Sequence, residues 1–188
     1  IAGAMSVEAL LASRRPFDER LMRVRPHPGQ GRSAAALRRM LGGLDGSEIG
    51  RSHASCSKVQ DAYSLRCMPQ VHGATRDALD WVRKVIEVEV NAITDNPIIF
   101  LEDAAGAPLP AGDLLSGGNF HGEPIGYAAD LTTMAVAEIG AISERRSYRL
   151  TEPTMSHGLP LNLVGGTLGL NTGFSLVHCT AAAIASEN

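Results

Sequence analysis

Two long helical segments constrain the fold of this chain more than any other feature. Residues 70–94 read as one helix, which the sequence TDNP ends. Its apolar positions keep helical spacing: Ala78, Trp81, Val82, Val85 and Val88. Residues 123–150 read as a second long helix, with Pro124 in its first turn, where proline is tolerated. The sequence therefore predicts an all-α protein in which loops join long helices.

Shorter helices complete this prediction. They are expected at residues 1–13, 17–25, 33–41, 59–67 and 168–187. Ser33 is expected to cap the helix at 33–41 and Gly42-Gly43 to end it. Residues 43–58 and 151–167 are predicted loops. Residues 98–120 are loop-like, with a short hairpin flanking a tip rich in alanine, glycine and proline.

Composition narrows the possible functions. The 188 residues, 44% of them hydrophobic and 20% charged, predict a single helical domain over 1–188 with a substantial core. No apolar run approaches the 18 residues of a membrane helix, so no membrane contact is expected. The three cysteines form no CxxC pair, and the six histidines show no metal-ligand spacing. We therefore expect a cytoplasmic protein without a metal site.

The charge distribution is uneven along the chain. Residues 1–66 carry 11 basic and 6 acidic side chains, and residues 67–188 carry 6 and 14. The arginines of the basic half alternate with apolar residues and lack interleaved aromatic residues, which argues against a nucleic-acid partner. Contacts between the halves or between subunits explain the pattern better. The chain also opens and closes within helical patterns, so we expect an interior piece of a longer protein.

The stretch QDAYSLR, residues 60–66, places an amide, a phenol and a guanidinium three residues apart. On a helix, Gln60, Tyr63 and Arg66 would span an arc of roughly 120° along one edge. Such a triplet could present polar groups to a ligand. Equally, Tyr63 could cap the core while Gln60 and Arg66 face solvent. The stretch alone does not decide between these interpretations.

The stretch SGGNFHGEP, residues 116–124, is the second unusual segment. Its glycines would let the backbone approach another group closely, and Phe120 follows them in a chain with only 4% aromatic residues. The simpler interpretation is a helix entry, with Asn119 or His121 near the N-cap and Phe120 as a hydrophobic staple. Further on, Glu144-Arg145-Arg146 predicts a structural salt-bridge cluster.

Together these motifs point to one family. The sequences FDERLMRVRPHPGQ, QDAYSLRCMPQV, EVEVNAITDNPIIF, LSGGNFHGEPI, AEIGAISERR and TAAAIASEN resemble, in the same order, the aromatic amino acid ammonia-lyase family in its histidine ammonia-lyase branch. The resemblance implies a long antiparallel helix bundle of the fumarase/aspartase-like ammonia-lyase fold. It also implies a homotetramer whose active sites are shared between subunits.

The resemblance assigns roles to four side chains. It places Arg66 on the substrate carboxylate and Tyr63 beside the prosthetic group as a catalytic acid/base or electrostatic partner. Gln60 would hydrogen-bond in the same pocket, and Phe120 would pack near the prosthetic group. The family electrophile is a methylidene-imidazolone formed from an internal Ala-Ser-Gly, and this tripeptide does not occur in the chain. We therefore expect the prosthetic group to come from a segment upstream of Ile1, and the isolated chain to be inactive.

The resemblance favours elimination of ammonia from L-histidine to give urocanate, because NFHGEP is typical of the histidine branch. Met68, His72 and a long 102–115 loop depart from the expected pattern, so a tyrosine or phenylalanine ammonia-lyase, or an aminomutase, stays open. A helical assembly domain without catalysis is the non-enzyme alternative. Four intact site residues argue against that alternative: Gln60, Tyr63, Arg66 and Phe120.

Overall fold

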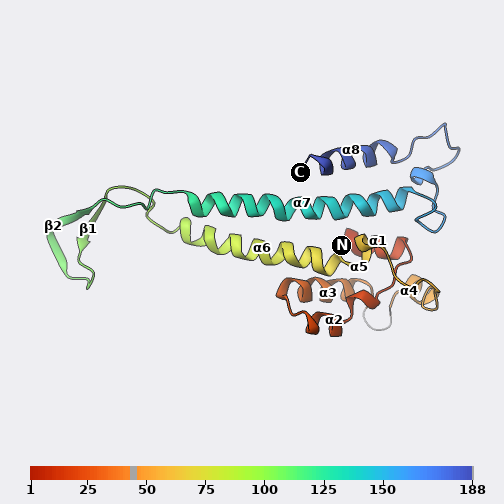
Figure 1. Cartoon of the computed structure of the whole chain (residues 1–188), viewed down its shortest axis with the longest axis horizontal. Coiled ribbons are helices and arrows are strands. Elements are labelled where there is room, and N and C mark those ends of the chain that lie inside the picture. The colour runs from red at the N-terminus through yellow and green to blue at the C-terminus, as the bar shows by residue number, and fades with distance from the viewer. Residues whose placement is uncertain (43–45, 188) are drawn as a thin grey trace. The chain divides into compact units, whose positions relative to one another are not determined.

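The computed structural model describes residues 1–42 and 46–187. Its helices are α1 (Ala2–Ala9), α2 (Glu19–Val24), α3 (Pro28–Met40), α4 (Glu48–Ser52), α5 (Tyr63–Arg66), α6 (Met68–Glu89), α7 (Glu123–Thr151) and α8 (Ser175–Ser186) (Figure 1). Two 3₁₀ segments, η1 (Arg15–Phe17) and η2 (Leu161–Leu163), and two strands, β1 (Ile98–Glu102) and β2 (Pro108–Leu115), complete the described chain. The dominance of helix agrees with the prediction.

The chain divides into two compact units. The first contains Ile1–Ala78 and Met134–Asn188, and the second contains Leu79–Thr133. Each unit is described by itself below. The sequence prediction of one helical domain stays a prediction.

The core of the first unit brings together residues from α1, η1, α3, α5, α6 and α7. Its buried members are Ala4, Val7, Leu10, Phe17, Leu37, Leu41, Leu65, Met68 and Ile142. Full burial of one large aliphatic or aromatic side chain contributes about 1.5–3 kcal/mol to folding. Because Leu65 and Met68 belong to this core, the short helix α5 and the start of α6 are fixed to it.

Helices α3 and α6 touch backbone to backbone through two glycines. A Cβ added to Gly73 would lie 2.3 Å from the backbone nitrogen of Gln30, and one added to Gly29 would lie 2.1 Å from the Gly73 carbonyl oxygen. Only residues without a side chain fit this crossing. The Gly29 amide also donates to Asp77 Oδ1 at 2.7 Å, so a carboxylate of α6 satisfies the N-terminus of α3.

This contact explains why the predicted start of α3 was wrong. The helix begins at Pro28, which occupies its first turn, and not at residue 33. Ser33 is therefore no N-cap but a buried residue in the middle of the helix. At the other end Leu41 is the C-cap, followed by Gly42 with φ of +84°. Gly43, predicted to help end this helix, lies outside the described residues.

Other helix boundaries also differ from the prediction. Helix α1 ends at Ala9, because Leu11 has a left-handed φ of 49°. Helix α2 begins at Glu19, where the Arg20 amide donates to the Asp18 side chain. The predicted loop at 43–58 contains α4, which Ser47 caps through the Gly50 amide at 2.9 Å.

The structure also differs from the prediction at the end of α6 and at the start of α8. Helix α6 ends at Glu89, five residues before the predicted boundary. The last helix begins at Ser175 and not at residue 168, because Gly169 and Gly173 have φ of +93° and +56°. By contrast, α7 spans Glu123–Thr151, one residue longer than predicted, with Pro124 in its first turn as expected.

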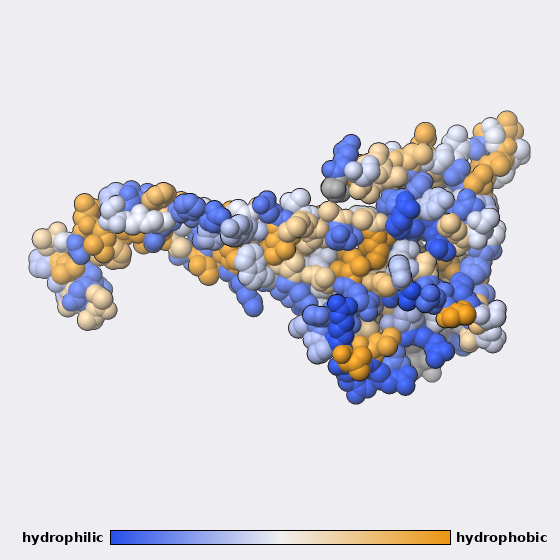
Figure 2. All heavy atoms as spheres, in the orientation of Figure 1, coloured by the Kyte–Doolittle hydropathy of each residue, from blue (hydrophilic) through white to orange (hydrophobic). Residues whose placement is uncertain are grey.

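In the second unit the predicted hairpin is present. Strands β1 and β2 pair antiparallel, with Ile98 opposite Leu115, and an irregularity lies between Phe100 and Glu102. Much of the hairpin surface is apolar, as the orange and tan atoms around β1 and β2 show (Figure 2). Leu101 and Leu114 are examples, each more than half exposed.

One sequence expectation about membranes needs correction. Of the helices in residues 1–42 and 46–187, α7 alone is long and apolar enough by length and composition to cross a bilayer, with a mean hydropathy of 1.2 in its tested window. The sequence expectation considered only uninterrupted apolar runs, and it therefore missed a long helix in which apolar residues alternate with polar ones. Core helices of soluble proteins pass the same test, so the finding does not assign a membrane location.

Candidate active site

Helix α5 presents two of the predicted site residues from a single helical turn. Tyr63 is its first residue and Arg66 its last. The guanidinium carbon of Arg66 lies 4.5 Å from the centroid of the Tyr63 ring, which is a cation–π contact. The two middle residues of the turn, Ser64 and Leu65, are buried. The turn is therefore anchored through its middle and displays a phenol beside a cation.

Both side chains can still bind another group. Tyr63 is 71% exposed, so it does not cap the core. Arg66 is half-buried, and its Nε has no hydrogen-bond partner among the described residues although it is shielded from solvent. A shielded guanidinium donor normally finds an acceptor. The arrangement suits recognition of an anionic group beside a phenol.

Gln60 does not lie on the same helical edge, contrary to the sequence prediction. Helix α5 begins only at Tyr63, and the preceding Ala62 has an extended backbone with ψ of 152°. Gln60 instead lines a pocket of about 310 Å³. The other lining residues are Leu10, Lys58, Asp61, Ala62, Leu65, Arg149 and Met155. Tyr63 and Arg66 do not line this pocket.

Asp61 explains why the chain leaves the helix before Tyr63. Its buried carboxylate accepts a hydrogen bond from the Ser13 amide at 2.8 Å and lies 3.4 Å from Lys58 Nζ. The bond from Ser13 ties the segment before α5 to the loop that follows α1, and continuing α5 backwards through Asp61 would break it. The sequence placed Asp61 inside the motif but gave no sign of this long-range anchor.

Phe120 belongs to the second unit. It lies between β2 and α7 and is 60% exposed. The segment before it is held by Asn96, whose side-chain oxygen accepts from the Gly117 amide at 2.7 Å and from Ser116 Oγ at 3.0 Å. No described atom lies within 4 Å of a Cβ added to Gly117 or Gly118. The role of Phe120 stays a prediction.

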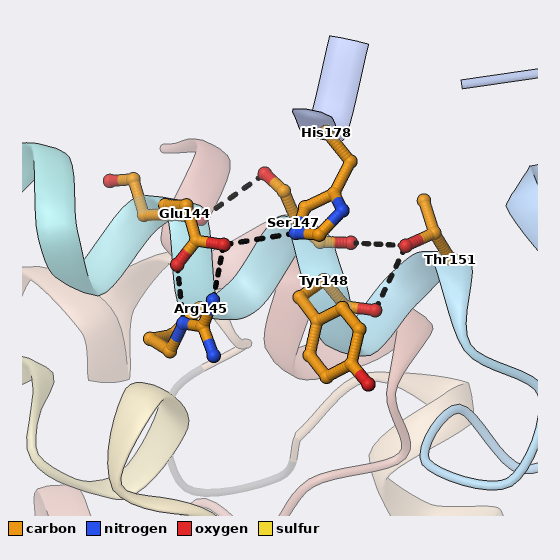
Figure 3. Close-up of polar contacts among 7 residues, drawn as sticks. Glu144, Arg145, Ser147, Tyr148, Thr151 and His178 are labelled. Atoms are coloured by element: carbon orange, nitrogen blue, oxygen red, sulfur yellow. Dashed lines mark hydrogen bonds and ion pairs between the residues drawn. The ribbon is translucent and has the colours of Figure 1, made fainter. Parts of the chain in front are cut away.

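The Glu144-Arg145-Arg146 stretch forms a structural cluster, but only two of its three residues pair with each other. Arg145 donates two hydrogen bonds to the Glu144 carboxylate, and His178 Nε2 of α8 lies 2.9 Å from Glu144 Oε1 (Figure 3). The Tyr148 and His178 rings stack with centroids 5.1 Å apart. Hydrogen bonds from Arg145, then His178, lower the pKa of the buried Glu144 carboxyl. The cluster holds α8 against α7.

His72 is a partly buried titratable residue of the first unit. The sequence did not indicate that its pKa would be shifted. Its Nε2 has no partner among the described residues. Burial, and then the charges of Arg146 and Arg76, lower its pKa from 6.5 to about 4. The folded protein therefore keeps the ring neutral at a pH where the unfolded chain protonates it.

We expect this histidine to make stability depend on pH. Stabilisation is complete above pH 6.5 and is lost as the pH falls towards 4, because only the unfolded chain gains the proton in that window. The loss amounts to about 2 kcal/mol once partial solvent access is allowed for. Thermal midpoints measured between pH 7 and pH 4 check this. His72→Met should flatten the slope, and an unchanged slope would contradict it.

The described residues contain no group of three or more histidine, cysteine, aspartate or glutamate side chains able to hold a metal ion.

Comparison with known proteins decides the family. The family model described as aromatic amino acid lyase matches residues 1–188. The chain belongs to the aromatic amino acid lyase family. Similar curated relatives include the histidine ammonia-lyase of Sorangium cellulosum (strain So ce56), 56% identical over 188 residues, and that of Vibrio cholerae, 50% identical over 188 residues. These alignments cover 100% of this chain but 35% and 34% of the relatives, so the chain spans about a third of their length.

Solved lyase structures confirm the predicted fold class. The crystal structure of histidine ammonia-lyase from Trypanosoma cruzi matches with a TM-score of 0.81 and 44% identity, over 99% of this chain and 32% of that one. Phenylalanine ammonia-lyase from the yeast Rhodosporidium toruloides matches with a TM-score of 0.81 and 29% identity, over 98% of this chain and 26% of that one. The long helices α6 and α7 are therefore those of the ammonia-lyase fold.

Proposed function

We propose that the protein containing this chain is a histidine ammonia-lyase, which eliminates ammonia from L-histidine to give urocanate. The observation that carries the proposal is the match of the whole chain to curated histidine ammonia-lyases, for example at 56% and 50% identity. The contact between Tyr63 and Arg66 on the single turn of α5 supports it, because the substrate carries a carboxylate and must lose a proton from its Cβ. In the reaction the Cα–N and one Cβ–H bond break, and a C=C bond forms.

Each of the four site residues would have a separate role in the reaction. Arg66, with its shielded Nε free of described partners, would bind the substrate carboxylate through its planar fork. Tyr63 would hold or move a proton at its phenol oxygen beside the reacting carbons. Gln60 would hydrogen-bond in the substrate pocket, and Phe120 would pack near the prosthetic group. Both roles are proposed from the family resemblance.

A methylidene-imidazolone group is part of this proposal. The residues present fit such a group, because Tyr63 is exposed and accepts no described hydrogen bond, which leaves its phenol available to a neighbour. When bound, this group supplies an electrophile that makes the substrate amino group leave. Its Ala-Ser-Gly precursor would come from another part of the whole protein. We also propose a cytoplasmic homotetramer with shared active sites, without nucleic-acid or membrane partners.

The experiment is a substrate panel on the full-length protein. Purified protein is incubated separately with L-histidine, L-tyrosine and L-phenylalanine, while product absorbance and released ammonia are followed. We expect urocanate and ammonia from histidine, with kcat/KM at least about 100-fold above the other two, since a site built around a polar ring rejects analogues that leave its polar groups unpaired. Residues 1–188 alone serve as a control and should be inactive.

A different substrate preference would redirect the proposal within the family. Tyrosine aminomutase from Streptomyces globisporus matches with a TM-score of 0.81 and 33% identity, over 98% of this chain and 36% of that one. A β-amino acid formed from tyrosine would therefore indicate an aminomutase, and cinnamate-type products would indicate a tyrosine or phenylalanine lyase. Absence of turnover with all three amino acids would favour the non-catalytic assembly domain.

A further inference from the structure

Arg146 reaches from α7 to the turn that carries the proposed site residues. The residue is 6% exposed, and its guanidinium donates from one terminal nitrogen to the Ser64 carbonyl oxygen at 3.2 Å, 82 residues away in sequence. The other terminal nitrogen donates to Ser143 Oγ at 2.8 Å on its own helix. Ser64 stands between Tyr63 and Arg66, so this bond ends inside the one turn that displays them.

This arginine is not held by a carboxylate. In the described part of the chain it forms no ion pair, whereas the neighbouring Glu144 pairs with Arg145 and lies close to His178. Burying an unpaired guanidinium costs several kcal/mol, and burial lowers the pKa of Arg146 accordingly. Its bonds to neutral oxygen atoms recover only part of that cost. A buried cation in this position is thus poorly explained by stability alone.

Helix α5 needs such an external support. It has four residues, and its N-cap, Ala62, offers no side-chain hydrogen bond. A single turn does not hold its own geometry, because forming the first turn fixes several backbone dihedrals for one hydrogen bond. Leu65 fixes one side of the turn to the core. Among the described residues, Arg146 alone donates a side-chain hydrogen bond to a backbone carbonyl of the turn.

We propose that Arg146 is a positioning residue of the ammonia-lyase site: by binding the Ser64 carbonyl, its guanidinium sets the orientation of both Tyr63 and Arg66. The inference rests on the proposed function and adds a residue that acts through the backbone, without touching substrate. Tilting of the turn moves the phenol and the guanidinium together. Loss of Arg146 should therefore affect substrate binding and turnover at once.

The test compares wild-type full-length protein with Arg146→Gln. Glutamine is shorter and uncharged, so the bond to Ser64 is lost. We expect kcat/KM per active site to fall by about 100-fold, the penalty typical of a misplacement of about 1 Å, with a raised KM and a lowered kcat. Arg146→Lys, which keeps the charge and a donor, should retain more activity. Arg39→Gln, an exposed arginine of α3 without a described partner, should match wild type.

A double-mutant cycle separates positioning from general destabilisation. In an Arg66→Gln background, Arg146→Gln should raise KM far less than it does in wild type, because no carboxylate clamp remains to be misplaced. Equal fold-changes in both backgrounds, or wild-type kcat and KM per active site in Arg146→Gln, would overturn the proposal.

Amide hydrogen exchange keeps the inference testable if the proposed function fails. Should wild-type protein turn over none of the three amino acids, the proposed function falls, whereas the positioning role is still measured by exchange in peptides covering residues 63–66. Faster exchange there in Arg146→Gln, with unchanged exchange in α1, supports positioning. Exchange that is equally faster in both segments, or that is unchanged in both, contradicts the positioning role.

Discussion

Replacing Tyr63 with phenylalanine in the full-length protein should lower kcat on histidine by about 10²–10⁴-fold, the usual contribution of a positioned acid/base group. KM should change little, because the phenol oxygen is assigned to proton transfer and Arg66 to carboxylate binding. Steady-state kinetics with active-site titration measure both constants. The substitution should be structurally mild, since the residue is 71% exposed and its hydroxyl has no hydrogen bond to the described residues.

Tyr127→Phe is the matched control for this prediction. Tyr127 is also an exposed tyrosine, 62% accessible, but it lies on α7 in the second unit and has no proposed role. Its variant should keep wild-type kcat. If Tyr63→Phe retained kcat within about twofold of wild type, far less than loss of an acid/base group produces, Tyr63 would have no part in proton transfer.

Arg66→Gln should act mainly on substrate binding. Removing one partner of a buried charge pair costs about 2–5 kcal/mol, so we expect kcat/KM to fall by roughly 30- to 5,000-fold, with most of the change in KM. A smaller fall in kcat should accompany it, because the cation that lies 4.5 Å from the Tyr63 ring centroid is lost as well. Kinetics with L-histidine measure both effects.

Inhibition by an analogue distinguishes carboxylate binding from a general loss of structure. Arg66→Gln should weaken competitive inhibition by urocanate, which carries a carboxylate, but not by histamine, which lacks one. Arg23→Gln, an exposed arginine of α2, is the control and should leave both inhibition constants unchanged. Equal weakening of both inhibitors would assign Arg66 a structural role.

The fold could be predicted well where the signals are local. Helical spacing and Pro124 located α7 almost to the residue, and the tip of residues 98–120 gave the hairpin. The start of α3 could not be predicted in this way, because a carboxylate from α6, Asp77, satisfies its first turn. The late start of α8 depends on left-handed glycines, whose conformation a composition of small residues does not reveal.

In the candidate site too, features set by local spacing could be predicted, and features set by long-range hydrogen bonds could not. Tyr63 and Arg66 lie together on one helical turn as predicted, because residues three apart on a helix are neighbours. Gln60 left the helical edge because Asp61 bonds to Ser13, 48 positions away. The sequence predicted that Arg146 belongs to a salt-bridge cluster. It instead donates to the Ser64 carbonyl, and a backbone acceptor cannot be recognised from the sequence.

The single turn from Tyr63 to Arg66 has a consequence for how this site can change. Each residue of an α-helix advances by about 100°, so inserting or deleting one residue between the phenol and the guanidinium would swing one of them to another side of the molecule. It would also withdraw Leu65 from the core. We therefore expect changes of substrate preference to come through side-chain replacements around this turn, and not through insertions or deletions within it.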